Sequence, residues 1–227
     1  MKGKKVLITS GGCLEKWDDV RGHTNLAKGT IGRLIAEEAL AEGAQVIYLH
    51  GYFAEKPNGD HHALELHPFE GIIDLQEKMK SIIVNEQIDV VIMAAAGSDW
   101  IVDKMYDQDG NLLDEQGKIS SDTAPVIHFK KAPKVLKQIK DWDANLFLIG
   151  FKLESGVHTD ELINRANTRM DGARADVMVA NAADSLYTRA AMHYILQKGE
   201  EPIVCNGKDE TAKAIVRVIK SANVVSL

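Results

Sequence analysis

The chain has 227 residues, of which 45% are hydrophobic, and it carries a formal net charge of −6 at pH 7. This length and apolar content suit one compact domain with a sizeable core. The acidic balance argues against nucleic acid as a partner, because binding to a phosphate backbone requires a basic face. We also expect no membrane partner, because no apolar run is long enough to span a bilayer.

The amino terminus and the two cysteines predict a cytoplasmic protein. The first apolar run, Lys5–Ser10, is too short for the hydrophobic region of a signal peptide, and no small-residue cleavage site follows it. Cys13 and Cys205 are far apart in sequence and neither belongs to a CxxC pair. We therefore expect two free thiols in a reducing compartment.

Strands and helices alternate through the first part of the chain. Apolar runs predict strands at Lys5–Ser10, Gln45–His50, 64–69 and 89–95. After the first strand come Gly11-Gly12 and a polar loop. Apolar residues at helical spacing then predict helices over residues 31–42 and 72–84. This alternation implies right-handed βαβ units and a parallel sheet.

A polar, glycine-punctuated stretch then interrupts the alternation, and we expect a partly ordered flap over about residues 97–124. Further strands are predicted at 125–129, 145–152 and 176–180, and further helices at 133–140, Thr159–Ala173 and 209–221. Ranges 190–196 and 202–205 flank Lys198-Gly199 and predict a β-hairpin. One α/β domain spanning residues 1–227, with a mainly parallel sheet, accounts for this order.

Small residues follow several predicted strands, at the edge where open parallel sheets bind ligands. Gly11-Gly12 and Ala95-Ala96 are examples, and small side chains let a backbone approach a ligand closely. Between Asn25 and Gly32 the chain enters a helix, whose first N–H groups have no partner within the helix. The stretch from Lys5 to Gly32 therefore predicts a phosphate site.

Several polar residues near these ends have both a structural and a functional interpretation. Asn25 is either the N-cap of the helix or an amide that contacts a substrate carboxylate or acyl group. Asp99 is either a solvated turn residue or a contact to nucleotide or metal, since Mg²⁺ is usually held by few carboxylates and by phosphates. Lys118 is either solvated or a mobile charge that closes on a triphosphate.

Two pairs of basic residues are similarly open. Lys130 and Lys131 precede the predicted helix at 133–140 and could face phosphate at its start. Arg165 and Arg169 share one face of the predicted helix Thr159–Ala173, either as a solvated pair or as a polyphosphate site.

Two other classes of function are weighed against catalysis with a nucleotide. A NAD(P)-dependent dehydrogenase or epimerase of the short-chain type needs a tight glycine turn and a Tyr-x-x-x-Lys pair. The second strand ends in His50-Gly51 without an acidic residue, Tyr52/Lys56 lies in a loop, and Tyr194/Lys198 lies on the predicted hairpin. A non-catalytic nucleotide-binding regulator is the other alternative, and it would bind nucleotide without releasing pyrophosphate.

A series of short motifs runs along nearly the whole chain. They are Ile8-Thr9-Ser10-Gly11-Gly12, Asp19-Val20-Arg21 with Thr24-Asn25, Gly29-x-x-Gly32, Ala94-Ala95-Ala96 with Asp99, Lys118-Ile119, Phe129-Lys130-Lys131-Ala132-Pro133, Gly150-Phe151-Lys152-Leu153-Glu154 and Val179-Ala180-Asn181. Their order and spacing resemble phosphopantothenate–cysteine ligases (phosphopantothenoylcysteine synthetases), in the single-function bacterial form that lacks a flavin-dependent decarboxylase domain.

The resemblance implies a Rossmann-like, doubly wound fold used as a homodimer. It also implies a reaction in which a nucleoside triphosphate activates the carboxylate of 4′-phosphopantothenate as an acyl-nucleotide and releases pyrophosphate. The amine of cysteine then gives phosphopantothenoylcysteine and a nucleoside monophosphate. Mg²⁺ would accompany CTP or ATP, and neither flavin nor NAD would be required.

The resemblance also implies roles for individual residues. Asn25 corresponds to the asparagine that handles the acyl intermediate, and Lys118 to the essential lysine of the flap. Nucleotide contacts are expected from Gly11, Gly12, Ala95, Ala96, Asp99, Lys118, Pro133, Phe151, Arg165 and Arg169, with Asp99 also a metal contact, mostly through phosphates. Contacts to the other substrates are expected from Arg21, Asn25, Lys28, Gly29, Lys131 and Asn181.

The sequence departs from the bacterial pattern at two places. The basic residue of the loop after Asn25 is Lys28, before Gly29, whereas the family carries its lysine after the first glycine of this loop. Residues 151–154 are more similar to the eukaryotic ligases, which favour ATP. The remaining layout is bacterial, and on that ground we expect CTP in preference to ATP.

Overall fold

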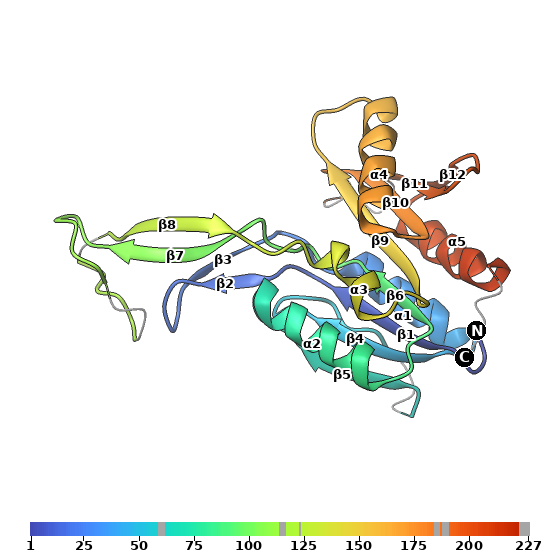
Figure 1. Cartoon of the computed structure of the whole chain (residues 1–227), viewed down its shortest axis with the longest axis horizontal. Helices are drawn as coiled ribbons and strands as arrows, with labels where there is room; N and C mark the ends of the chain where they lie inside the picture. The colour runs from blue at the N-terminus through green and yellow to red at the C-terminus, as the bar shows by residue number, and fades with distance from the viewer. Residues whose placement is uncertain (59–61, 114–116, 123, 184–186, 188–190, 223–227) are drawn as a thin grey trace.

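The computed structural model of the chain describes residues 1–58, 62–113, 117–122, 124–183, 187 and 191–222. Within them, one eight-stranded sheet has the order β12-β11-β10-β9-β6-β1-β4-β5 (Figure 1). Its strands are β1 (Lys5–Ser10), β4 (Gln45–His50), β5 (Leu64–Pro68), β6 (Val90–Met93), β9 (Phe147–Glu154), β10 (Val177–Ala182), β11 (Met192–Gln197) and β12 (Ile203–Asn206). The six strands β10-β9-β6-β1-β4-β5 pair in parallel, whereas β11 and β12 are antiparallel. The predicted mainly parallel sheet and its C-terminal hairpin are confirmed.

Helices cover both faces of the sheet, so the fold is Rossmann-like and doubly wound (Figure 1). One face packs against α1 (Thr30–Ala41) and α5 (Lys208–Ser221), and the other against α2 (Ile72–Asn85), α3 (Ile139–Trp142) and α4 (Thr159–Ala173).

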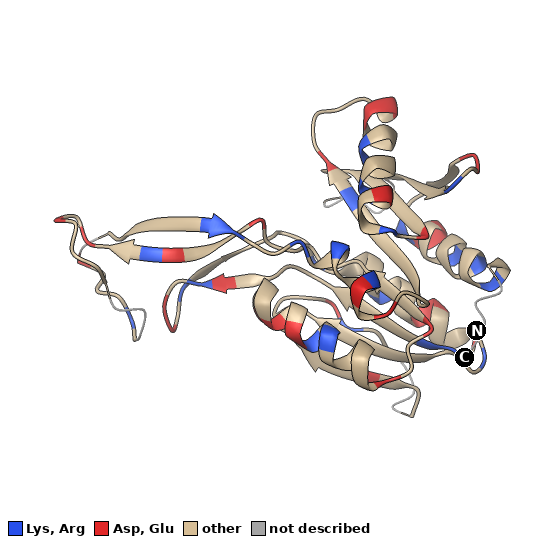
Figure 2. Cartoon of the chain, viewed as in Figure 1, with Lys and Arg blue, Asp and Glu red and all other residues tan. Residues whose placement is uncertain are grey.

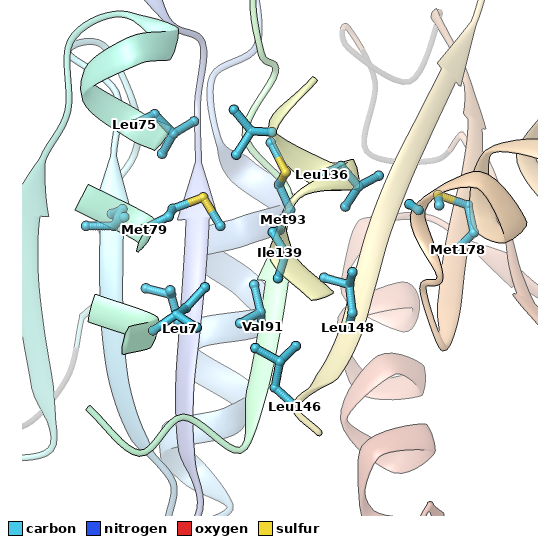
Figure 3. Packing of buried hydrophobic residues seen from close by; sticks show 14 of the residues in the cluster. Leu7, Leu75, Met79, Val91, Met93, Leu136, Ile139, Leu146, Leu148 and Met178 are labelled. Carbon is cyan, nitrogen blue, oxygen red and sulfur yellow. The ribbon is translucent and has the colours of Figure 1, made fainter. Parts of the chain in front are cut away.

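Successive residues of the central strands alternate between the two faces, as the strand period requires. Leu7 of β1 joins the cluster beneath α2 and α3, whereas its neighbours Val6 and Ile8 pack against α1 and α5. Figure 3 shows Leu7 beside Val91 on β6, with Met79 of α2 among the residues that pack over these strands. Because both faces are buried, these strands are apolar throughout.

An antiparallel ribbon with one register shift, between Val102 and Lys104, begins within the predicted flap. Its strands are β7 (Trp100–Tyr106) and β8 (Val126–Lys131), which together extend away from the body of the molecule (Figure 1). Strand β8 confirms the strand predicted at 125–129, whereas β7 was not predicted, because its residues are mostly exposed or half-buried and form no continuous apolar run. Residues 114–116 and 123 of the flap, residue 190 of the predicted hairpin and residues 223–227 lie outside the described residues.

Two further predictions are corrected. The polar loop after Gly12 contains a short hairpin, β2 (Leu14–Lys16) and β3 (Gly22–Thr24). The helix predicted at 133–140 is instead a 3₁₀ turn, Val135–Lys137, followed by the single turn of α3. Lys134, the residue before the 3₁₀ turn, has a non-helical backbone (φ −92°, ψ 79°), so no helix runs from 133 into this turn.

Helix α1 lies unusually close to β1 at Gly32. A Cβ atom at this position would lie 2.3 Å from Oγ and 2.6 Å from Cβ of Ser10, well inside van der Waals contact. The absence of a side chain at Gly32 therefore sets how closely the start of α1 approaches the end of β1.

We predict that Gly32→Ala lowers the free energy of unfolding by about 1–3 kcal/mol through overpacking, although alanine is the better helix former by about 1 kcal/mol. Gly172→Ala in α4 is the matched control, since the nearest atom to a Cβ there is Cε of Lys137, at 3.8 Å. Urea unfolding should show Gly172→Ala unchanged or more stable. Equal effects of the two substitutions would contradict this account of the close approach.

Candidate active site

A cavity of about 480 Å³ opens at the edge of the sheet where β6, β9 and β10 end. Its walls come from residues 25, 27–31, 93–99, 133–136 and 151–153, together with Ile72, Arg169, Asn181, His193 and Lys208. This is the edge at which open parallel sheets bind ligands, so the cavity lies where the strand ends predicted it.

The start of α1 forms one end of the cavity. Gly29, the residue before the helix, has a left-handed backbone (φ 76°), and its carbonyl accepts a 2.9 Å hydrogen bond from Oγ of Ser10. The first turn of α1 carries no acidic residue. Lys28 and Gly29 both line the cavity. The positive end of the helix dipole and Lys28 together make this end suitable for an anion.

Asn25 also lines this end of the cavity, but it is not the helix cap. The helix starts at Thr30 with Gly29 as its N-cap, so the N-cap interpretation of Asn25 is wrong. Gly12 determines where Asn25 lies, because a Cβ at Gly12 would be 2.7 Å from the Asn25 carbonyl oxygen. Gly11 and Gly12 themselves lie outside the lining; Gly12 contacts the segment that carries Asn25, whereas a Cβ at Gly11 would meet Ala54.

The middle of the cavity is formed by the loop after β6. The backbone N–H groups of Ala94 and Ala95 donate to the carbonyl and hydroxyl oxygens of Thr9, at 3.1 and 3.2 Å. Ser98 donates a 2.6 Å hydrogen bond to the buried carboxylate of Glu15, which also accepts from the N–H of Ile72 at the start of α2. This loop, which carries the predicted contacts Ala95, Ala96 and Asp99, is therefore held from two sides.

Asp99 forms an ion pair with Lys134, which follows the predicted contact Pro133. Among the described lining residues, Asp99 is the single acidic side chain, and five basic side chains line the same cavity. These are Lys28, Lys134, Lys152, Arg169 and Lys208. Elsewhere the charges of both signs are interspersed along the body and the arm (Figure 2). The cavity thus concentrates positive charge in an acidic protein and suits a multiply charged anion.

The far end of the cavity contains Phe151, Arg169 and Asn181, three of the predicted contacts. The two arginines of α4 differ although they lie four residues apart. Nη1 of Arg165 pairs with Oε2 of Glu154 at 2.9 Å, its Nη2 pairs with Glu161, and Arg165 is not among the residues that line the cavity. Arg169 lines the cavity, and its contact to nucleotide stays a prediction.

Three more of the predicted residues lie outside the cavity lining. Arg21 is at the tip of the β2–β3 hairpin, paired with Asp18. Lys118 is exposed on the short segment 117–122, beside that tip. Lys131 is the exposed last residue of β8. It was expected to face phosphate at the start of a helix at 133–140, but the structure has a 3₁₀ turn there. The chain by itself does not bring Lys118 next to Asn25.

Among the lysine, arginine and histidine side chains of the lining, sequence reasoning missed four: Lys134, Lys152, His193 and Lys208. Lys134 and Lys152 directly follow predicted contacts, and this adjacency was the available signal. His193 is the second residue of β11, which is antiparallel, so the amino end of this strand lies beside the carboxyl ends of the parallel strands. Reading only the carboxyl ends of the predicted strands therefore does not identify His193.

The histidine is held in one orientation by α5. Nδ1 of His193 lies 2.7 Å from Oγ1 of Thr211, and this hydroxyl donates to the Gly207 carbonyl at 2.7 Å. Because the hydroxyl proton is committed to Gly207, Nδ1 is the donor in the other hydrogen bond, as assigned from the network.

The cysteines do not supply a nucleophile to this site. Burial raises the pKa of the Cys13 thiol to about 12, and burial likewise raises the pKa of Cys205. Both thiols are free, as predicted, and both are buried. In the part of the chain that the structure describes, no group of three or more His, Cys, Asp or Glu residues could hold a metal ion. The helices of these same residues are too short or too polar to cross a membrane.

Residues 1–222 match the family model described as DNA/pantothenate metabolism flavoprotein C-terminal domain. The coenzyme A biosynthesis bifunctional protein CoaBC of Thermococcus kodakarensis is 30% identical over 220 residues, covering 97% of this chain and 49% of that protein. The phosphopantothenate–cysteine ligase of Mus musculus is 33% identical over 101 residues, 44% of this chain and 31% of that protein. The chain spans about half the length of the bifunctional relatives.

Among solved structures, the DNA/pantothenate metabolism flavoprotein from Streptococcus pneumoniae has a TM-score of 0.86 and 27% identity. The match covers 97% of this chain and 100% of that chain.

The different placement of the two arginines generates a prediction. We expect Arg169→Gln to weaken binding of inorganic triphosphate about tenfold, since a charge-assisted hydrogen bond contributes about 1.5–3 kcal/mol. Arg165→Gln, the matched control on the same helix, should leave the affinity unchanged. Isothermal titration calorimetry measures both, and equal losses in the two variants would contradict the placement.

Proposed function

The chain belongs to the DNA/pantothenate metabolism flavoprotein C-terminal domain family, and we propose that it is a phosphopantothenate–cysteine ligase of coenzyme A biosynthesis. In the proposed reaction, a carboxylate oxygen of 4′-phosphopantothenate attacks the α-phosphorus of a nucleoside triphosphate and pyrophosphate leaves. The amine of L-cysteine then attacks the acyl carbon, loses a proton, and releases the nucleoside monophosphate.

The observation that carries this proposal is the convergence of Asn25, the Ala94–Asp99 loop and Arg169 on one basic cavity. The reaction must bring a triphosphate beside a substrate that has its own phosphate and carboxylate. Two like unit charges about 4 Å apart repel by about 4 kcal/mol at an effective dielectric constant of 20. A helix start and five basic side chains are suited to offset this repulsion.

The two ends of the cavity suit different substrates. We assign 4′-phosphopantothenate to the end formed by Asn25, Lys28 and the start of α1. The amide of Asn25 would then donate to the acyl oxygen on which charge develops. The nucleotide is assigned to the other end, with its phosphates toward Asp99 and Arg169 and its base or ribose toward Phe151.

Mg²⁺ is proposed to enter with the nucleotide. One lining carboxylate, Asp99, fits a cation held mainly by phosphates, because Mg²⁺ commonly keeps several waters and takes only one or two protein carboxylates. When bound, Mg²⁺ would neutralise charge on the phosphates. For the nucleotide we propose CTP, with ATP as the alternative that residues 151–154 suggest.

The position of Lys118 supports a homodimer in this proposal. Lys118 lies outside the cavity of its own chain, beside the β2–β3 tip and the extended arm. The arm exposes Trp100, Leu112, Val126 and Phe129. An isolated two-stranded ribbon is only marginally stable in water. We propose that a second copy of the chain covers this arm.

The proposal is tested by pyrophosphate release with CTP and ATP in parallel, each with and without 4′-phosphopantothenate. Release should require 4′-phosphopantothenate, and kcat/KM should be higher with CTP. Nucleotide binding without any release would favour the regulator instead. A higher kcat/KM with ATP would overturn the nucleotide assignment alone.

We predict that Asn25→Asp slows consumption of the acyl-nucleotide roughly 100-fold, the scale of losing a donor to a developing oxyanion. The pyrophosphate burst should persist while the acyl-nucleotide accumulates, as followed by single-turnover mass spectrometry. Leu26→Ala, at an exposed neighbour outside the lining, is the control. Normal consumption in Asn25→Asp would remove Asn25 from the chemistry.

A further inference from the structure

The segment that carries Lys118 is docked on the tip of the β2–β3 hairpin. The N–H of Asp19 donates to the Gly117 carbonyl at 3.5 Å, on one side of Lys118. On the other side, the N–H of Ile119 donates to Oδ2 of Asp18 at 3.1 Å, and Nη2 of Arg21 donates to the Ile119 carbonyl. The backbone is therefore held on both sides of Lys118, while its side chain is exposed.

Hydrogen bonds within the hairpin tip also fix the side chains of Asp18 and Arg21, which contact the segment. Oδ1 of Asp18 accepts from the N–H groups of Val20 and Arg21 at 2.9 and 2.7 Å. Oδ2 accepts from Nε of Arg21 at 3.0 Å. The Asp18 side chain is only 1% exposed. A buried carboxylate is stable only when it is paired and hydrogen-bonded in this way. The hydrogen bonds within the tip therefore fix the Asp18 carboxylate in the position from which it accepts from Ile119.

The ionisation of Asp18 agrees with this geometry. Burial disfavours the charged carboxylate, but the N–H groups of Val20, Arg21 and Ile119 and the charge of Arg21 outweigh burial and lower the pKa of Asp18. The carboxylate is therefore charged at neutral pH and able to accept from Ile119.

We propose that Asp18 and Arg21 are positioning residues that hold the backbone around Lys118, so that the hairpin tip determines where this lysine is presented. The inference rests on the proposed function, in which Lys118 acts on the triphosphate. Arg21 was expected from the sequence to bind substrate. In this proposal it acts instead through Lys118.

Positioning has a distinct energetic consequence. Ordering a flexible backbone costs roughly 1–2 kcal/mol per residue, and the bonds at the tip offset this cost before substrate arrives. Misplacement of a reacting group by about 1 Å can slow a reaction on the order of 100-fold. Loss of the tip contacts should therefore slow the step that Lys118 serves without weakening the binding of 4′-phosphopantothenate.

The test uses a double-mutant cycle of Asp18→Asn and Lys118→Gln in the full chain, with Arg21→Met as a second disruption of the same tip. The readout is the rate of acyl-nucleotide formation, measured as the pyrophosphate burst without cysteine. We expect each single variant to be slowed roughly 10- to 100-fold. Asp18→Asn should add little in the Lys118→Gln background, because both changes remove one interaction.

Two further measurements separate positioning from other roles. Hydrogen–deuterium exchange of a peptide containing residues 117–122 should speed up in Asp18→Asn and in Arg21→Met. Lys16→Gln is the matched control, since it removes the Lys16–Glu70 ion pair of the same hairpin without touching the segment. This control should change neither the exchange nor the burst.

Four results would overturn the inference, and they do not all have the same meaning. Additive losses in the cycle, or weaker 4′-phosphopantothenate binding in Arg21→Met, would show that the tip acts on substrate rather than through Lys118. Unchanged exchange in Asp18→Asn would remove the docking itself. A wild-type protein that releases no pyrophosphate would refute the proposed function, and with it the role of Lys118, whatever the exchange shows.

Discussion

The geometry of the site depends on the way β1 and β6 continue to pair beyond the end of the regular sheet. Ala96 donates to the Gly11 carbonyl at 2.8 Å, and Gly12 and Ala96 form a further parallel bridge. Gly12 also admits the Asn25 carbonyl to a position that a Cβ atom would occupy. One junction therefore sets the spacing between the segment that carries Asn25 and the loop that carries Asp99, which are the walls of the cavity.

This junction lets a protein of net negative charge build a basic site. The charge at the site comes from residues far apart in sequence, such as Lys28, Arg169 and Lys208, which the sheet edge gathers around one space. Around this cavity, buried strands and the hydrogen bonds of the loop after β6 hold the backbone in place. Two substrates that repel each other can be held side by side only if their surroundings are fixed in this way.

Much of the fold could be predicted from the sequence because apolar runs such as Gln45–His50 must be buried on both faces of a sheet. The residues at strand ends, including Ala95 and Phe151, followed from the same rule. The short β2–β3 hairpin and β7 carry no comparable signal, because their residues are half-exposed. Helical spacing placed Arg165 and Arg169 on one face, but the pairing of Arg165 with Glu154 depends on tertiary structure. The docking of Ile119 on Asp18 joins residues about 100 apart, and no local pattern predicts such a contact.

The central claim is that the cavity activates a carboxylate by attaching it to a nucleotide. The most direct measurement follows the oxygen atoms of 4′-phosphopantothenate labelled with ¹⁸O in its carboxylate. If an acyl-nucleotide forms and cysteine consumes it, mass spectrometry should find one labelled oxygen in the nucleoside monophosphate and none in pyrophosphate. Label in inorganic phosphate with a nucleoside diphosphate as co-product, or product formed with an unlabelled monophosphate, would contradict the account.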